Sequence, residues 1–105
     1  MRLINEYELQ FCKILYSCIS VKVGVDSNQT VWIINPEMGS VRSIKCDKKS
    51  KVYAVSQCET RDIDGTPVIV TLLLSSEKEF GELDFWKVDD SPIKNHNYLM
   101  KNINV

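Results

Sequence analysis

The sequence predicts a small α+β domain, with one N-terminal helix packed on a single antiparallel sheet of five or six strands. Three observations lead to this fold. Helical spacing of apolar residues is confined to residues 5–19. From residue 21 onward, short β-prone runs alternate with turn residues. The links between these runs are shorter than a parallel crossover requires, so we expect neighbouring strands to be antiparallel.

The helix is expected over residues 5–19. Asn5 and Glu8 have the spacing of a capping box, in which the Asn side chain accepts from a free amide and the Glu side chain reaches back. After them, residues of apolar character recur at helical spacing: Tyr7, Phe11, Ile14, Leu15 and Cys18. This amphipathic pattern is typical of a helix that covers one side of a sheet.

Six runs are expected to form strands, at residues 21–25, 30–34, 40–46, 52–59, 68–74 and 82–88. The pair Asp64-Gly65 is the strongest local hairpin signal, because this dipeptide favours tight turns between antiparallel strands. The run 68–74 is apolar on both faces, so it predicts a central strand that the helix covers on one side.

The chain of 105 residues has the size of one domain, residues 1–105. Its last part, residues 94–105, is expected to be an irregular tail. A few apolar residues in this tail could dock a short turn onto the domain: Tyr98, Leu99, Met100 and Ile103.

Charge and hydropathy favour a cytoplasmic protein. The formal net charge is −1, which gives no chain-wide attraction to nucleic acid or to a membrane surface. No run approaches the roughly 20 apolar residues of a membrane helix, and the N-terminus carries acids where a signal peptide is apolar.

The cysteines lack the paired spacing of zinc or redox sites, so we expect buried, reduced thiols: Cys12, Cys18, Cys46 and Cys58.

No catalytic, cofactor or metal site is expected. Phosphate loops, nucleophile elbows and Gly-rich fingerprints do not occur in the sequence. His96 lies in a polar stretch and is interpreted as a surface histidine. Glu82 and Asp84 share one face of a strand and could in principle form an acid–base pair, but a solvated strand face is the favoured interpretation, because such a site needs a larger cleft than this domain can spare.

The charges are unevenly distributed along the chain. Residues 59–90 contain nine acids and three bases, whereas residues 42–51 contain five bases and one acid. Such an uneven charge distribution can steer a basic partner to the acidic side; alternatively, the charges protect strand edges from unwanted pairing.

The two tryptophans differ in their surroundings. Trp32 lies in an apolar run and is expected in the core. Trp86 shares a strand face with Glu82 and Asp84. It is interpreted either as an anchor for a partner protein or as a core residue packed beneath the C-terminal tail.

Three segments resemble a family of small bacterial single-domain proteins of unknown function. They are Met-Gly-Ser-Val-Arg at 38–42, Asp-Gly-Thr-Pro-Val-Ile-Val-Thr-Leu at 64–72, and Gly-Glu-Leu-Asp-Phe-Trp-Lys-Val-Asp-Asp-Ser-Pro-Ile at 81–93. The last is similar to a closing Glu-Leu-Asp-x-Trp-Lys-Val-Asp-x-Ser-Pro block. The chain departs from the family at Asp90, where an aromatic residue is expected, and after Ile93. The resemblance implies a fold and a lineage, and small bacterial proteins of this kind are frequently immunity proteins against toxins.

Two functions of different classes follow as hypotheses. The first is a non-catalytic immunity protein that covers the active site of a cognate protein toxin, plausibly a nuclease. It would act as a monomer or weak homodimer and use the acidic strand and its ends: Glu79, Glu82, Asp84, Trp86, Asp89 and Asp90. The second is a structural or regulatory protein that self-associates through a sheet edge. A small enzyme based on Glu82 and Asp84 is a third, weaker alternative.

Overall fold

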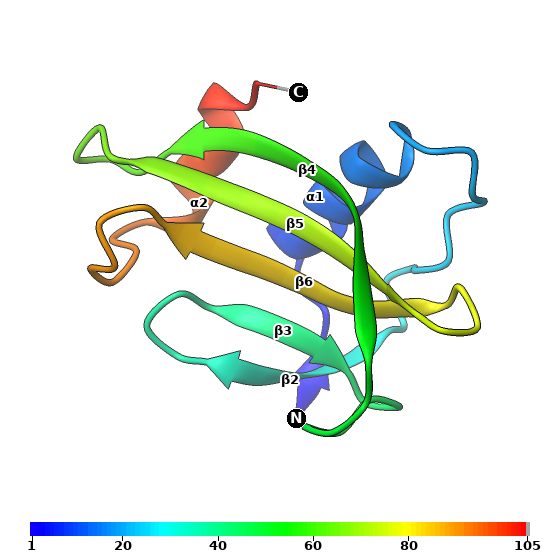
Figure 1. Cartoon of the computed structure of the whole chain (residues 1–105). Helices are drawn as coiled ribbons and strands as arrows, with labels where there is room; N and C mark the ends of the chain where they lie inside the picture. The colour runs from blue at the N-terminus through cyan, green and yellow to red at the C-terminus, as the bar shows by residue number, and fades with distance from the viewer. Residues whose placement is uncertain (105) are drawn as a thin grey trace.

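The computed structural model describes residues 1–104 and has the predicted α+β fold, one N-terminal helix on a six-stranded antiparallel sheet (Figure 1). The strands lie side by side in the order β1-β2-β3-β6-β5-β4, and each pair of neighbours is antiparallel. Their bounds are Arg2–Leu3 (β1), Thr30–Asn35 (β2), Ser40–Ser43 (β3), Val52–Arg61 (β4), Pro67–Ser75 (β5) and Phe80–Lys87 (β6). Helix α1 (Glu6–Tyr16) lies behind the sheet in Figure 1, so it covers one face and leaves the opposite face open.

The start of α1 has the predicted capping box. The Asn5 side chain accepts from the N–H of Glu8, and the Glu8 carboxylate accepts from the N–H of Asn5, both at 3.0 Å. Glu8 is fully buried, and Arg2 donates to its two carboxylate oxygens at 2.8 and 2.7 Å. A bidentate pair fixes orientation as well as charge, so the residue that caps α1 also holds β1 in place.

The prediction of a strand over residues 21–25 is wrong. Strand β1 pairs with one side of β2 and β3 with the other, which leaves no place for a further strand beside β2. The chain instead leaves α1 at Tyr16, earlier than expected, and residues 17–29 run as a loop. Within this loop Val25 is buried, Val21 packs partly buried against the core and Val23 is exposed, so the apolar residues reflect docking of the loop rather than a strand.

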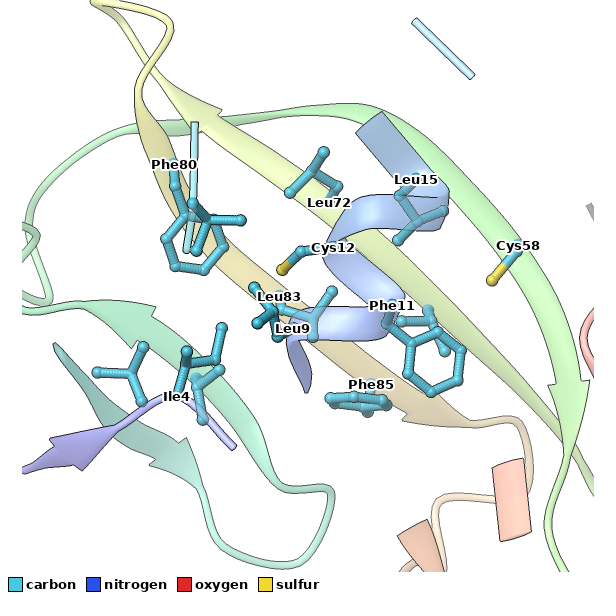
Figure 2. Packing of buried hydrophobic residues seen from close by; sticks show 14 of the residues in the cluster. Ile4, Leu9, Phe11, Cys12, Leu15, Cys58, Leu72, Phe80, Leu83 and Phe85 are labelled. Atoms are coloured by element: carbon cyan, nitrogen blue, oxygen red, sulfur yellow. The ribbon is translucent and has the colours of Figure 1, made fainter. Parts of the chain in front are cut away.

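The hydrophobic core lies between α1 and the sheet. On β5, every second side chain is buried against the helix: Val68, Val70, Leu72 and Leu74. Figure 2 shows Phe11, Cys12 and Leu15 of α1 facing this layer, with Leu83 and Phe85 of β6 beneath them. The Phe11 and Phe85 rings meet edge to face, with centroids 5.6 Å apart, an arrangement that aromatic pairs favour. The prediction that residues 68–74 form a central, helix-covered strand is confirmed.

The C-terminal segment is more ordered than predicted. Residues His96–Leu99 form one turn of helix (α2), followed by a 3₁₀ turn at Met100–Asn102 (η1). Leu99 is fully buried, and its carbonyl oxygen accepts from the hydroxyl of Thr60 on β4. Asn104 then exchanges two backbone hydrogen bonds with Glu59 of β4. Met100 and Ile103 also pack against the core. The tail therefore docks through a short turn, as expected, but this turn is helical and not irregular.

Two further expectations concern membranes and thiols. The longest helix has 11 residues, so none of the helices in the described part of the chain has the length and apolarity of a membrane span. Cys12, Cys46 and Cys58 are buried as free thiols, and burial raises the pKa of Cys58 to about 11. Cys18, which was expected to be buried with them, is exposed because the helix ends before it.

Candidate surface for partner binding

The open face of the sheet is the set of side chains that point away from α1. Strand register aligns them in rows, since directly opposed residues share a face. One row joins Trp86, Ile69 and Glu59; the next joins Asp84, Thr71 and Gln57. A third row runs from Trp32 through Arg42 and Glu82 to Leu73. The face thus has one tryptophan on β2, next to the edge strand, a second on the interior strand β6, and a pair of opposite charges on β3 and β6.

The structure separates the six side chains predicted to bind a partner. Glu82, Asp84 and Trp86 lie on the open face of β6, and Asp89 and Asp90 lie in the turn that follows. Glu79 lies in the turn before β6, so the strand, about 25 Å long, separates it from Asp89. Glu79 is also 3.8 Å from the Nζ of Lys45, in an exposed ion pair on the basic side of the molecule.

Glu82 is not an exposed charge. Its carboxylate accepts from the Nε of Arg42 at 2.7 Å, and the two side chains are only 10% and 13% exposed. Arg42 also donates to the carbonyls of Asp47 and Ser50 and holds their loop against the sheet. Burial raises the pKa of Glu82, and the lowering effect of Arg42 does not fully offset it. Glu82 therefore pairs with Arg42 inside the molecule. This corrects the prediction that its carboxylate is part of a partner-binding surface.

The indole ring of Trp86 is held by one hydrogen bond, and almost half of the residue is exposed to solvent. Its side chain lies on the open face, the residue is 45% exposed, and the indole N–H donates to the Asp90 carboxylate at 2.8 Å. Asp90 adopts a left-handed backbone conformation, with φ of 63°, which Asp tolerates better than most residues. The turn after β6 thus positions an acceptor for the indole, and the ring stays accessible.

Two further carboxylates come from this end of β6, Asp84 on the strand and Asp89 in the turn after it. Asp84 accepts from the hydroxyl of buried Ser40 at 2.9 Å, which orients it on the open face. Asp89 accepts from the hydroxyl and the N–H of Ser91 at 2.7 and 3.0 Å. These hydrogen bonds lower the pKa of Asp89, so the group is ionised at neutral pH. The surface around Trp86 therefore combines an accessible aromatic ring with acidic groups.

Behind this surface is a buried ion cluster that the sequence did not suggest. We call Lys87, Asp62 and Asp64 the Lys87 cluster. The fully buried Lys87 ammonium donates to Asp62 at 2.8 Å and Asp64 at 2.6 Å. Asp62 is also fully buried and accepts from the backbone N–H groups of Lys94 and Asn95 at 2.7 and 3.1 Å. The cluster links the β4–β5 hairpin, the end of β6 and the tail.

The charge states of the cluster follow from these contacts. Burial alone lowers the pKa of Lys87, but the hydrogen bonds to both carboxylates outweigh it and the pKa is raised. The hydrogen bond from Lys87 holds the pKa of Asp64 well below its usual range. Burial raises the pKa of Asp62, but the lysine and the backbone amides together lower it below normal. All three groups are therefore charged at neutral pH.

His96 is half-buried against other parts of the molecule, whereas the sequence suggested a surface histidine. Its Nε2 lies 2.7 Å from the carbonyl oxygen of Met38, and its ring stacks on Tyr7 and meets Phe85 edge-on. Gly39 has φ of +78° and lies directly against the ring, so a side chain there would clash. The histidine thus fixes the start of the tail to the β2–β3 turn.

Comparison with known proteins identifies the family to which the chain belongs. A model of a family described as a domain of unknown function (DUF6984) matches residues 1–97, which is nearly the whole chain. The protein belongs to this family. No curated protein and no solved structure matches it. Among residues 1–104, no group of three or more His, Cys, Asp or Glu side chains is placed to hold a metal ion.

Proposed function

We propose that the protein is a non-catalytic binding protein, an immunity protein that neutralises a cognate toxin in the bacterial cytoplasm. The observation that carries the proposal is Trp86, a half-exposed tryptophan held by Asp90 on a sheet face that no helix covers. Interface hot spots are enriched in tryptophan. A ring that is already oriented also loses little side-chain freedom on binding.

The charges around Trp86 support a basic partner. Asp90 accepts from the indole, Asp84 precedes Trp86 by two residues on the same face, and Asp89 lies in the turn after the strand. The lysine of β6, Lys87, is buried in its own ion cluster. A toxin that degrades nucleic acid carries a basic surface to hold its polyphosphate substrate. An acidic surface with a central tryptophan would compete for that basic surface and cover the toxin's active site.

The test uses the toxin encoded next to the gene of this protein. Trp86→Ala should weaken binding by about 2 kcal/mol, a roughly 30-fold rise in Kd by calorimetry. Asp89→Lys should slow association and reduce its dependence on salt, because one attractive charge becomes repulsive. Circular dichroism of each variant checks that the fold is retained.

Glu77→Lys is the matched control, since Glu77 is an exposed acid in the β5–β6 turn, at the far end of β6. It should protect cells against the toxin as well as the unaltered protein does. If the Trp86→Ala and Asp89→Lys variants also give full protection, the Trp86 surface is not the interface. The exposed lysines of residues 45–51 would then be the next region to examine.

A further inference from the structure

The open face of the sheet carries a second tryptophan, Trp32 on β2. Instead of the core position predicted from the sequence, it lies half-buried on the open face, directly opposite Arg42 of β3. Its indole N–H donates to the carbonyl oxygen of Cys46 at 2.9 Å, which orients the ring. A hollow of about 200 Å³, which we call the Trp32 hollow, is lined by Trp32, Ile34, Arg42 and Lys48.

Lys48 belongs to the loop between β3 and β4, and this loop has a fixed shape. The Arg42 guanidinium donates to the carbonyl oxygens of Asp47 and Ser50, which holds the loop against the open face. The Asp47 carboxylate accepts from the N–H groups of Lys49 and Ser50 at 2.8 and 2.9 Å. Because the loop is already ordered, a ligand that binds beside it pays little for its immobilisation.

The charges of this loop are available to a ligand. Lys48, Lys49 and Lys51 are exposed, and none of them forms an ion pair with another of residues 1–104. Arg42, in contrast, is already bonded to Glu82. The arginine that could grip a carboxylate with two hydrogen bonds is therefore engaged, and the free cations are lysines, which bind phosphate as point charges. The site thus favours a phosphate-bearing ligand.

We propose that the Trp32 hollow binds one base of a single-stranded nucleic acid, with the phosphates of the strand at the lysines of the β3–β4 loop. Every base has a face that stacks on an aromatic ring, and a basic surface beside the ring follows the backbone. The hollow is smaller than the pockets of about 300–1,000 Å³ that hold drug-sized ligands, so it takes one planar ring. The exposed lysines outnumber what one phosphate requires, which favours a strand over a free nucleotide.

The inference goes beyond the proposed function and does not depend on it. Trp32 and Trp86 lie on β2 and β6, which β3 separates. Acids accompany Trp86 whereas lysines accompany Trp32, so the two sites suit partners of opposite charge. The net charge of −1 gives no chain-wide attraction to nucleic acid, and binding at the Trp32 hollow is therefore local and sensitive to salt.

The test is fluorescence anisotropy of a labelled oligothymidylate of about 12 nucleotides, titrated with the whole protein at low salt. Trp32→Leu should weaken binding about tenfold, because the stacking ring is lost. Trp32→Phe keeps a ring and should retain most of the affinity. Both variants lose the indole N–H that bonds Cys46, so the difference between them measures stacking alone. Circular dichroism checks that each variant is folded.

Lys48→Gln tests the contribution of charge. It should weaken binding and reduce the slope of log affinity against log salt by about 0.7, the value for one phosphate of a single strand. Lys13→Gln is the matched control, since Lys13 is an exposed lysine of α1, which lies on the other side of the sheet (Figure 1). It should leave the affinity and the slope unchanged.

Four outcomes would overturn the proposal. Absence of binding at low salt, or equal losses in Trp32→Leu and Trp32→Phe, would refute the stacking site. Equal effects of Lys48→Gln and Lys13→Gln would refute the role of the loop. Thymidine monophosphate should bind more weakly than the oligonucleotide, because it carries one phosphate; equal affinity would show a site for a free nucleotide. An oligoglutamate peptide that binds as tightly as the oligonucleotide would identify an acidic peptide as the partner instead.

Discussion

Trp86 and Lys87 are consecutive residues of β6 with environments opposite to their polarity. The tryptophan lies on the open face, half exposed, while the lysine is fully buried beneath the tail and the β4–β5 hairpin. The alternation of a strand sends them to opposite sides. The surroundings on each side explain the difference in burial. None of the described helices covers the open face, so Trp86 stays exposed, whereas on the covered face Asp62 and Asp64 accept from the Lys87 ammonium.

This comparison assigns different roles to the two residues. The Lys87 cluster connects parts of the chain that are distant in sequence and should matter mainly for stability. Trp86 pairs with Ile69 of β5, donates to Asp90 and keeps almost half of its surface exposed, so it should matter mainly for a partner. Substitutions at the two positions can test whether this division holds.

The largest effect is expected for Lys87→Met, which keeps the length of the side chain but removes its charge. Two carboxylates, one of them fully buried, would lose their cation, and breaking a buried pair in this way costs about 3–5 kcal/mol. Urea unfolding at pH 7 measures the loss. Adding Asp62→Asn should recover part of it, because the buried uncompensated charge is then gone; no recovery would mean that packing, rather than charge, explains the loss.

The second effect is a dependence on pH. Asp62 and Asp64 have folded-state pKa values below the unfolded value of about 3.9. Their stabilisation is therefore complete above that pH and is lost as the pH falls through the folded-state values. Lys87 has a raised pKa, so its contribution is complete below about pH 10.4 and is lost as the pH rises through the folded-state value.

The difference in stability between the unaltered protein and Lys87→Met should therefore shrink as the pH falls below about 4. Thermal unfolding followed by circular dichroism between pH 7 and pH 2 measures it. A difference that stays constant over this range would show that the carboxylates of the cluster are not coupled to the lysine.

The smallest effect on folding is expected for Trp86→Ala. Because almost half of the residue is already exposed, the loss of buried area should cost about 1–2 kcal/mol, less than Lys87→Met. The same urea titration gives the comparison. A loss as large as that of Lys87→Met would indicate that Trp86 stabilises the sheet instead of remaining available to a partner.

Local signals predicted much of this fold correctly. The capping box at Asn5 and Glu8, the Asp64-Gly65 turn and the apolar run of β5 are each determined by neighbouring residues, and each appears as expected. Strand β1 could not be found in this way, because its two residues form a strand only by pairing with Thr30 and Val31, which are distant in sequence.

The candidate surface was predicted less completely, for a similar reason. Placing Glu82, Asp84 and Trp86 on one face already implies that Lys87 points to the other, with Leu83 and Phe85. Period two alone could therefore have revealed a buried lysine. Its partners, Asp62 and Asp64, have the sequence pattern of ordinary turn residues. The ion pair between Glu82 and Arg42 forms only when β3 and β6 become neighbours.

The place of β6 in the sheet has a consequence for how the chain is made. Strands β1, β2 and β3 form one half of the sheet and β4 and β5 the other, and β6 alone joins them. Synthesis from the N-terminus produces the two halves first, and each then presents an unpaired edge of the kind that invites aggregation. In genetic terms, a stop codon just before Phe80 would leave most of the chain but not the strand that unites it. A nonsense mutation just before Phe80 should therefore be as damaging as one near the start of the chain.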